Sequence, residues 1–397
     1  MSDNTISTVT EPLMQTYGRF PLTLKKGKGS YVWDDQGEKY LDYTAGIATC
    51  NLGHVPDVVK NQLDNQLQDL WHCSNLYHIP AQQKLAELLV DNSCGDQVFF
   101  CNSGAEANEA AIKLARKYAH DTKGKGEYEV VTFTSSFHGR TLATLTATGQ
   151  AKIQQGFAPL TPGFTYLPYN DVDALDSLVE SEHTCAVLLE VVQGEGGVIP
   201  ADSEWLNKLS SICKEQGILL MVDEIQTGMG RTGSLFAYEQ YGIEPDIISL
   251  AKGLGSGFPI GAMIAKKHVA ASFSPGTHGS TFGGNPLAAT AGYATVKHMI
   301  ESDVLTNVKE ISAYLTDGLN GLAEKYSQIK AVRGKGLLLG LVVDKAAINY
   351  VNKAREKNLL ILVAGPEVVR VLPPLTTTKD EVDQFIAIMD EVFAEVG

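Results

Sequence analysis

Short, nearly continuous runs of apolar residues recur through the middle of the chain. Each run is as long as a typical strand, and an unbroken apolar run is expected where a strand is buried on both faces of a sheet. The runs are Gln97–Cys101, Glu129–Phe133, Ala186–Val192, Ile218–Val222, Ile247–Leu250 and Ile260–Ala265. They predict the strands of one central sheet.

Helical patterns lie between several of these runs. Apolar residues recur at i, i+3 and i+4 spacing in two of them, at Ala107, Ala110, Ala111, Leu114 and Tyr118, and at Trp205, Leu209 and Ile212. Strands that alternate with helices favour an α/β fold with a mostly parallel sheet.

The pattern differs on both sides of this region. Near the start, Ser30–Trp33 and Lys39–Tyr43 flank turn-forming residues, which predicts a hairpin. Beyond Pro286, residues 287–330 have the pattern of long helices, and two later strands, Leu337–Val343 and Val368–Leu372, are separated by a helix. We therefore expect a second, smaller α+β domain.

Composition narrows the possible partners and location. The 397 residues are 44% hydrophobic and 20% charged, as in a folded globular protein, and the formal net charge of −14 disfavours binding to nucleic acid or to an anionic membrane. Six scattered cysteines without a C-x-x-C pair indicate free thiols, and residues 1–5 lack the features of a secretion signal. The expected location is the cytoplasm.

Several common catalytic motifs are absent. The sequence has no P-loop, no H-E-x-x-H and no G-x-S-x-G, and the glycine-rich segment 253–257 lacks the G-x-G-x-x-G spacing of a dinucleotide motif. His72, Cys73 and His78 are close in sequence but lack further ligands at metal-binding spacing, so we expect no metal site.

Three segments that follow predicted strands carry the remaining chemistry. Small residues around Ser103 leave a helix N-terminus open to a phosphate group, although Ser103 and Glu106 could instead form a capping box. Asp223 ends a strand where α/β sheets bind ligands, although it could simply cap a helix or form an ion pair. Lys252 ends another strand; most lysines are solvated, but a buried amine has a lowered pKa and attacks aldehydes. A phosphate seat, an acid and a lysine together predict pyridoxal 5′-phosphate (PLP).

Longer segments strengthen this interpretation through a resemblance. The chain resembles the class III, ornithine-type aminotransferases, in matching order from Tyr17 to Leu375. The segments that carry the likeness are CNSGAEANEAAIKLAR (101–116), SFHGRTLATL (136–145), MVDEIQTGMGRTG (221–233), SLAKGLGSGFPIGA (249–262), HGSTFGGNPLA (278–288) and RVLPPL (370–375).

The resemblance implies the PLP-dependent transferase fold type I. In this fold a large domain with a mostly parallel seven-stranded sheet, here residues 51–285, is joined to a small α+β domain formed by both chain ends, here 1–50 and 286–397. It also implies a homodimer whose two active sites are shared between the subunits.

The resemblance further assigns residues to the cofactor. Lys252 is implied as the catalytic lysine that forms a Schiff base with PLP, and Asp223 as the partner of its pyridine nitrogen. Phe137 would stack on the ring, and Thr281 would reach the phosphate bound by the neighbouring subunit. The full set expected at the cofactor is Ser103, Gly104, Ala105, Phe137, Asp223, Glu224, Ile225, Gln226, Lys252 and Thr281.

Two arginines are implied at the substrates. Arg140 would bind one carboxylate in a bidentate fork and Arg370 a second one, while Glu195 would pair with Arg370 whenever the second carboxylate is absent. Arg140 could instead serve in an ion pair near the phosphate, and Glu195 could be a simple turn residue. The remaining residues expected to contact substrate are Tyr17, Ile47 and Ser280.

The apolar Ile47, at a position where ornithine-specific members carry a tyrosine, favours an acylated amine as substrate. The expected reaction, in arginine biosynthesis, transfers the δ-amino group of N2-acetylornithine to 2-oxoglutarate and yields N-acetylglutamate 5-semialdehyde and glutamate. Ornithine, succinylornithine and 4-aminobutyrate stay open as alternative donors, and a glutamate semialdehyde aminomutase stays open as a different reaction.

Overall fold

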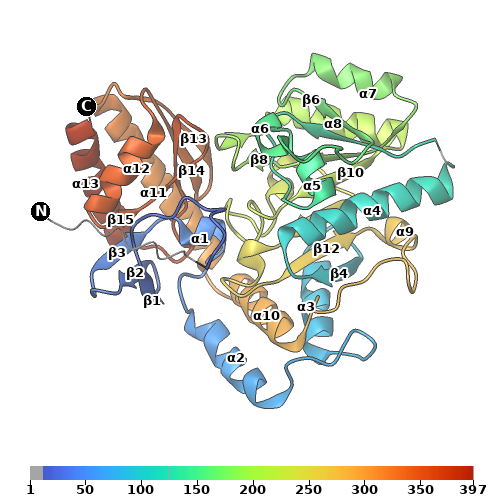
Figure 1. Ribbon diagram of the computed structural model, residues 1–397, viewed down its shortest axis with the longest axis horizontal. Helices are drawn as coiled ribbons and strands as arrows, with labels where there is room; N and C mark the ends of the chain where they lie inside the picture. Colours follow the sequence, from blue (N-terminus) through green and yellow to red (C-terminus); the bar gives the residue numbers. More distant parts are fainter. Residues whose placement is uncertain (1–11, 125, 397) are drawn as a thin grey trace, which may run out of the picture.

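The computed structural model describes residues 12–124 and 126–396, so the N-terminal residues 1–5 discussed above lie outside the described part (Figure 1). Its centre is a seven-stranded sheet. In spatial order the strands are β4 (Gln97–Cys101), β12 (Gly261–Ala265), β11 (Ile247–Leu250), β10 (Leu219–Asp223), β7 (Thr184–Leu189), β5 (Glu129–Phe133) and β6 (Phe164–Leu167). The α/β prediction with a seven-stranded sheet is confirmed.

The direction of β12 decides which chain segments meet at one edge of the sheet. β12 runs antiparallel to both of its neighbours, β4 and β11, whereas the other pairs are parallel. The carboxyl ends of β4, β10 and β11 therefore lie along the same edge, and β12 begins there. This arrangement brings Ser103, Asp223 and Lys252 to one side of the sheet.

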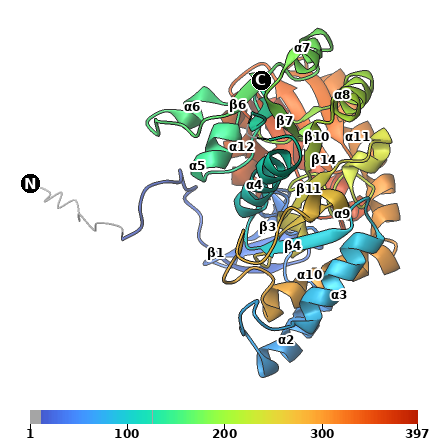
Figure 2. The same cartoon turned by 90° about the vertical axis from the view of Figure 1, so that its right-hand side faces the viewer.

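Helices cover the sheet as the periodicity predicts. α4 (Gly104–Thr122) buries Ala107, Ala110 and Leu114 against the strands, and α8 (Ser203–Gln216) buries Trp205 and Leu209. Figure 2 shows α4 lying across one face of the sheet. Shorter elements connect the larger ones: α5 (Leu142–Ala147), α6 (Ala151–Gln154), η1 (Asp173–Leu175), α7 (Asp176–Glu180), η2 (Ala237–Tyr241), η3 (Lys252–Leu254) and α9 (Lys267–Ala270).

The two ends of the chain meet in a second region, on the left of Figure 1. The predicted hairpin is present as β2 (Tyr31–Asp34) and β3 (Lys39–Asp42), preceded by β1 (Leu24–Lys28), and β3 pairs in parallel with β15 (Leu359–Leu360). The other elements of this region are β13 (Ile329–Lys335), β14 (Leu338–Val343), β16 (Leu362–Val363), β17 (Val368–Val371), α1 (Ala45–Ala48), α11 (Val304–Lys325), α12 (Ala347–Glu356) and α13 (Lys379–Val396).

One long helix bears on the proposed domain boundary. α10 (Pro286–Glu301) packs against α2 (Asp57–Asp69) and α3 (Pro80–Asp91), which belong to the segment assigned to the large domain. The division at residue 285 stays a proposal. Because α10 packs in this way, we propose that the boundary lies after α10 rather than before it.

Two stretches differ from the sequence prediction. The apolar run 186–192 is not one strand, because β7 stops at Leu189 and the chain resumes as β8 (Val192–Gln193), paired with β9 (Ile199–Pro200). The helical pattern expected to extend to residue 330 ends at Lys325, and β13 starts at Ile329. β13 is mostly half-buried and contains Lys and Arg, so its sequence resembles that of a helix surface. Within the described ranges, no helix is long and apolar enough to cross a membrane.

Candidate active site

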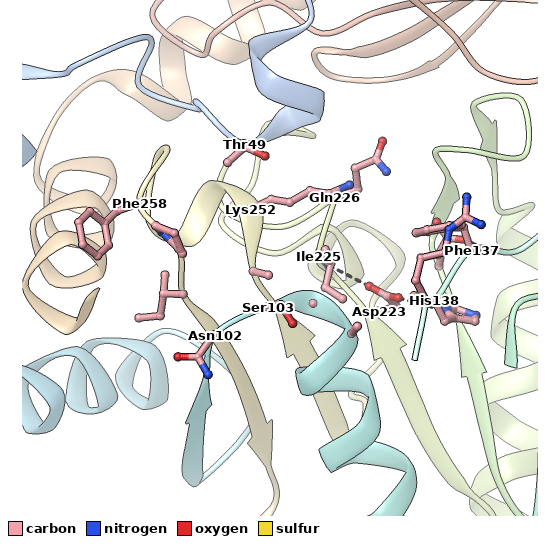
Figure 3. A pocket seen from close by; sticks show the side chains of 18 of the residues that line it. Thr49, Asn102, Ser103, Phe137, His138, Asp223, Ile225, Gln226, Lys252 and Phe258 are labelled. Atoms are coloured by element: carbon pink, nitrogen blue, oxygen red, sulfur yellow. Dashed lines mark hydrogen bonds and ion pairs between the residues drawn. The ribbon is translucent and has the colours of Figure 1, made fainter. Parts of the chain in front are cut away.

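A cavity of about 450 Å³ opens at the carboxyl ends of β4, β10 and β11 (Figure 3). Most of the residues expected at the cofactor line it. The lining residues from that expected set are Ser103, Gly104, Ala105, Phe137, Asp223, Ile225, Gln226 and Lys252. Sequence positions far apart in the chain are thus brought to one pocket.

The N-terminus of α4 forms one wall of the cavity. The Ser103 hydroxyl accepts a hydrogen bond from the Glu106 N–H at 3.2 Å, as a helix N-cap should. The Glu106 carboxylate, however, accepts from the N–H of Asn102 at 2.5 Å rather than from that of Ser103, so only half of a capping box forms. The N–H groups of Gly104 and Ala105 lie in the first helical turn, where the helix itself offers no acceptor, and they are available to an anion.

Gly104 is required by the close approach of a neighbouring side chain. A Cβ atom at this position would lie 2.7 Å from Cδ1 of Ile225, which follows β10 and lines the floor of the cavity. Any side chain at position 104 would therefore push Ile225 into the space of the pocket. Glycine keeps both the helix N-terminus and the floor open to a flat ring that carries a phosphate group.

The Asp223 carboxylate is held by three donors. Its Oδ2 accepts from Asn108 Nδ2 at 2.7 Å and lies 2.8 Å from His138 Nδ1, and its Oδ1 accepts from the Ile225 N–H at 3.0 Å. Asp223, Asn108 and His138 are buried, and Ile225 is partly buried. Such an acid is fixed in direction and suited to pair with a cation on a ligand.

Asn108 and His138 were not singled out by the sequence analysis. Both lie inside segments that carry the family likeness, 101–116 and 136–145. This likeness was the one feature of the sequence that could have pointed to them. Their pairing with Asp223 joins segments far apart in the chain and is visible only in three dimensions. His138 also lines the cavity, and its Nε2 is buried without a hydrogen-bond partner among the described residues.

Lys252 lies at the start of η3, directly after β11, and has a left-handed backbone conformation with φ of +40°. Figure 3 shows its side chain extending across the cavity towards Gln226. Burial lowers the pKa of the Lys252 amine to about 8, although the carboxylate of Glu195 opposes this shift. A substantial share of the amine is therefore neutral near physiological pH, as a nucleophile or base must be.

Arg370 and Glu195 form a forked ion pair next to Gln226, which lines the cavity. Arg370 Nη1 lies 2.6 Å from Glu195 Oε1, and Nη2 donates to Oε2 at 3.2 Å. Burial opposes ionisation of Glu195, but Arg370 more than offsets this effect and holds the pKa of Glu195 below its usual value. Gln226 joins the pair, because its Oε1 accepts from Arg370 Nη1 at 3.1 Å.

Arg140 and Phe137 lie together at the mouth of the cavity. The Arg140 guanidinium carbon is 5.5 Å from the centre of the Phe137 ring, within range of a cation–π contact. Arg140 is exposed, so its donors can reach a carboxylate that enters from solvent.

Besides Ser280 and Thr281, five expected residues do not line this cavity: Glu195 and Arg370, described above, and Glu224, Ile47 and Tyr17. Glu224 is buried on the other side of the chain, where it accepts from the Thr227 hydroxyl and the Tyr238 N–H, and burial raises its pKa to about 7. Its side chain is thus engaged away from the expected cofactor. Ile47 in α1 is 43% exposed, and Tyr17 is 73% exposed on an N-terminal segment that projects from the body in Figure 2.

Ser280 and Thr281 lie at a second, neighbouring cavity of about 390 Å³, not at the first. Asn102 lines both cavities and donates to the Ser280 hydroxyl at 3.2 Å. The sequence resemblance places Thr281 at the cofactor of a neighbouring subunit, and its position outside the cavity of its own chain is compatible with that expectation.

Comparison with known proteins identifies the family. Residues 13–393 match the family described as aminotransferase class-III. The chain belongs to the class III aminotransferases. It is 62% identical, over 98% of its length and 97% of the relative's, to the acetylornithine aminotransferase of Oceanobacillus iheyensis.

Solved structures of this class share the fold. The ornithine aminotransferase from Toxoplasma gondii, solved with PLP at partial occupancy, has a TM-score of 0.94 at 32% identity over 97% of this chain and 92% of that one. The N-acetylornithine aminotransferase from Stenotrophomonas maltophilia has a TM-score of 0.83 at 39% identity over 96% and 97%.

PLP is the cofactor of this aminotransferase, and the described cavity fits it chemically. The free amides of α4 suit a phosphate, the held carboxylate of Asp223 suits a ring nitrogen, and the buried amine of Lys252 suits an aldehyde. No cluster of His, Cys, Asp or Glu able to hold a metal ion occurs among the described residues.

Proposed function

We propose that this aminotransferase transfers the δ-amino group of N2-acetylornithine to 2-oxoglutarate, giving N-acetylglutamate 5-semialdehyde and glutamate, in arginine biosynthesis. The observation that carries the choice of substrate is the 62% identity to a relative named acetylornithine aminotransferase, which covers nearly all of both chains. The arrangement of charged side chains around the cavity supports it.

The chemistry at the cofactor needs few protein groups. PLP, when bound, carries the amino group between the two half-reactions and withdraws electrons from the substrate carbon that loses a proton. Lys252 is the group placed to remove that proton and return it, because its amine is buried and its pKa is lowered to about 8. Asp223, fixed by Asn108 and His138, would stabilise positive charge on the ring nitrogen.

Substrate selection would depend on the two arginines. Arg140 would bind the α-carboxylate of N2-acetylornithine, and the Glu195–Arg370 pair would stay closed, since this donor has no second carboxylate. The second carboxylate of 2-oxoglutarate would replace Glu195 on Arg370. The buried guanidinium of Arg370 thus keeps an anionic partner in both half-reactions. Leaving this charge buried and unpaired would cost several kcal/mol.

We also propose that the active enzyme is a homodimer in the cytoplasm. Large apolar side chains, Trp71, Leu76, Tyr77 and Phe282, are all more than half exposed on the segments near Ser280 and Thr281, as expected of a surface that a partner covers. The six cysteines are free, which suits a reducing compartment. Light scattering of the purified protein should give twice the chain mass.

Ornithine is the second candidate donor, because the Toxoplasma gondii ornithine aminotransferase is very similar in fold. The decisive measurement is kcat/KM for N2-acetylornithine, succinylornithine, ornithine and 4-aminobutyrate, each with 2-oxoglutarate. We expect the highest kcat/KM for N2-acetylornithine. A higher value for ornithine would overturn the choice of donor, and turnover without any keto acid would indicate an aminomutase.

A further inference from the structure

Glu190 interrupts an otherwise apolar segment directly after β7. Its side chain is buried and lines the cavity, yet none of the roles described so far uses it. The carboxylate accepts two backbone hydrogen bonds. Oε2 accepts from the Phe137 N–H at 3.0 Å, and Oε1 accepts from the Gly194 N–H at 3.4 Å.

Each of the two bonded segments carries groups that act on ligands. Phe137 begins the turn that leads to Arg140 at the mouth of the cavity. Gly194 precedes Glu195, and its carbonyl oxygen accepts from Arg370 Nη1 at 3.0 Å. The proposed function requires Glu195 to leave Arg370 when a second carboxylate binds. The Gly194 peptide directly precedes Glu195 and would be the pivot, the point about which Glu195 turns.

The surroundings of Gly194 allow little freedom. A Cβ atom there would lie 2.3 Å from Gln226 Oε1, so the side chain of Gln226 packs directly on the glycine. On the opposite side, the bond to Glu190 ties the same peptide to the loop of Phe137. The pivot is therefore fixed between Gln226 and Glu190.

We propose that Glu190 is a positioning residue that holds the pivot of Glu195 and the loop of Phe137 at a fixed separation, so that the exchange between the two substrates is a local rotation. The inference rests on the proposed function, since Glu195 needs to move only if the enzyme takes both a dicarboxylate and a monocarboxylate. Glu190 acts through these two backbone groups rather than on the substrate.

The charge state of Glu190 would tune this role. Burial raises its pKa to about 7, with His138 opposing the shift and Asp223 adding to it. The titratable side chains that act on it electrostatically come from several segments: His138, Tyr169, Glu195, Asp223 and Lys252. In a protonated carboxyl one oxygen carries the proton and becomes a weaker acceptor, so below about pH 7 the longer bond to Gly194 is the one expected to weaken.

Hydrogen–deuterium exchange of the full-length apoprotein tests the proposal without any need for turnover. Glu190→Ala should raise amide exchange in the peptides that contain Phe137 and Gly194 by roughly fivefold, the effect of losing about one hydrogen bond. Glu190→Gln keeps one acceptor oxygen and should raise exchange in only one of them. Tyr169→Phe is the matched control, because the Tyr169 hydroxyl donates to the Glu190 backbone carbonyl and not to its carboxylate.

A second measurement compares the two half-reactions by cofactor absorbance. Glu190→Gln should change the ratio of kcat/KM for 2-oxoglutarate to that for N2-acetylornithine by roughly fivefold. In the parent enzyme we expect this ratio to vary with pH near neutrality, as Glu190 titrates. The Gln variant, which does not titrate, should lose that pH dependence. Unchanged exchange in both peptides of either variant would overturn the proposal. If Glu190→Ala exchanges faster in all peptides of the protein, the substitution has destabilised the whole fold, and the exchange pattern of Glu190→Gln then decides. Failure of the parent enzyme to use N2-acetylornithine would refute the proposed function and leave the exchange test intact.

Discussion

The residues expected at the cofactor are more buried and more firmly held within this chain than several of those expected at the substrate. On the cofactor side, Asp223 is buried and held by three donors, and Gly104 and Ile225 fit closely together. On the substrate side, Arg140 and Ile47 are exposed, and Tyr17 projects on an extended segment. The contrast indicates that the chain pre-forms the cofactor site, whereas the substrate side is more open; we propose that the substrate and a second subunit complete it.

The largest expected effect lies on the buried side. Lys252→Ala should lower turnover by at least about 10³-fold, because it removes the only group proposed to move the substrate proton. The variant should still bind PLP, now reversibly, so that gel filtration removes the cofactor. Borohydride should attach it to the peptide containing Lys252 only in the parent protein. Lys266→Ala, at a lysine outside the cavity, is the control, and turnover comparable to the parent in Lys252→Ala would refute the assignment.

The next effect tests the fixed acid. Asp223→Ala should slow removal of the substrate proton by about 10²–10³-fold, since the ring nitrogen loses its charged partner. Rapid-mixing absorbance with a donor deuterated at the reacting carbon measures this step directly. Asp223→Asn, which keeps the shape and removes the charge, should be nearly as slow. Kinetics equal to the parent in both variants would exclude Asp223 from this role.

A smaller effect is expected at the boundary between the two sides. Glu195→Gln leaves Arg370 without an anionic partner, so kcat/KM should shift about tenfold in favour of glutamate over N2-acetylornithine. The shift is modest because Glu195 is partly exposed to solvent. Glu224→Gln serves as the control, since its carboxylate faces away from the cavity, and an equal shift in that variant would contradict the specific role of the pair.

The smallest effect concerns the proposed partner subunit. Thr281→Val should weaken PLP binding roughly fivefold through loss of one hydrogen bond to the phosphate, although Thr281 does not line the cavity of its own chain. Fluorescence titration of the apoprotein measures the affinity. Thr277→Val, on the same loop, should leave it unchanged. An unaltered affinity in Thr281→Val would argue against sharing of the phosphate site.

The apolar runs predicted that strands exist better than they predicted where strands end. β4, β5 and β11 begin and end at the predicted residues, whereas the fully buried β7, β10 and β12 differ from their predicted bounds, because an unbroken apolar run can continue past the end of a strand. β6 was missed, since its short sequence at the sheet edge is only partly buried. The residues expected to bind the cofactor were predicted from motifs. Lys252 was also predicted independently, because a buried amine near the end of a strand has a lowered pKa and is a nucleophile.

Other parts of the site could not be predicted from sequence. Asn108 and His138 act on Asp223 across long stretches of chain, and no local pattern reports such a contact. Glu190 was read as part of an apolar strand, but β7 ends at Leu189 and the Glu190 carboxylate accepts hydrogen bonds from two distant backbone N–H groups. Glu224 was expected at the cofactor from the family resemblance, but successive side chains at a strand end point in opposite directions.

The pairing of β3 with β15 has a consequence for how the protein is made. β3 is synthesised long before β15, the strand that lies beside it. Arg231 likewise precedes two of its acceptors, because its buried guanidinium donates to the carbonyl oxygens of Leu337 and Pro373. A nascent chain can thus assemble the central sheet before these two acceptors are synthesised, and the packing around Arg231 is completed only by the later segment.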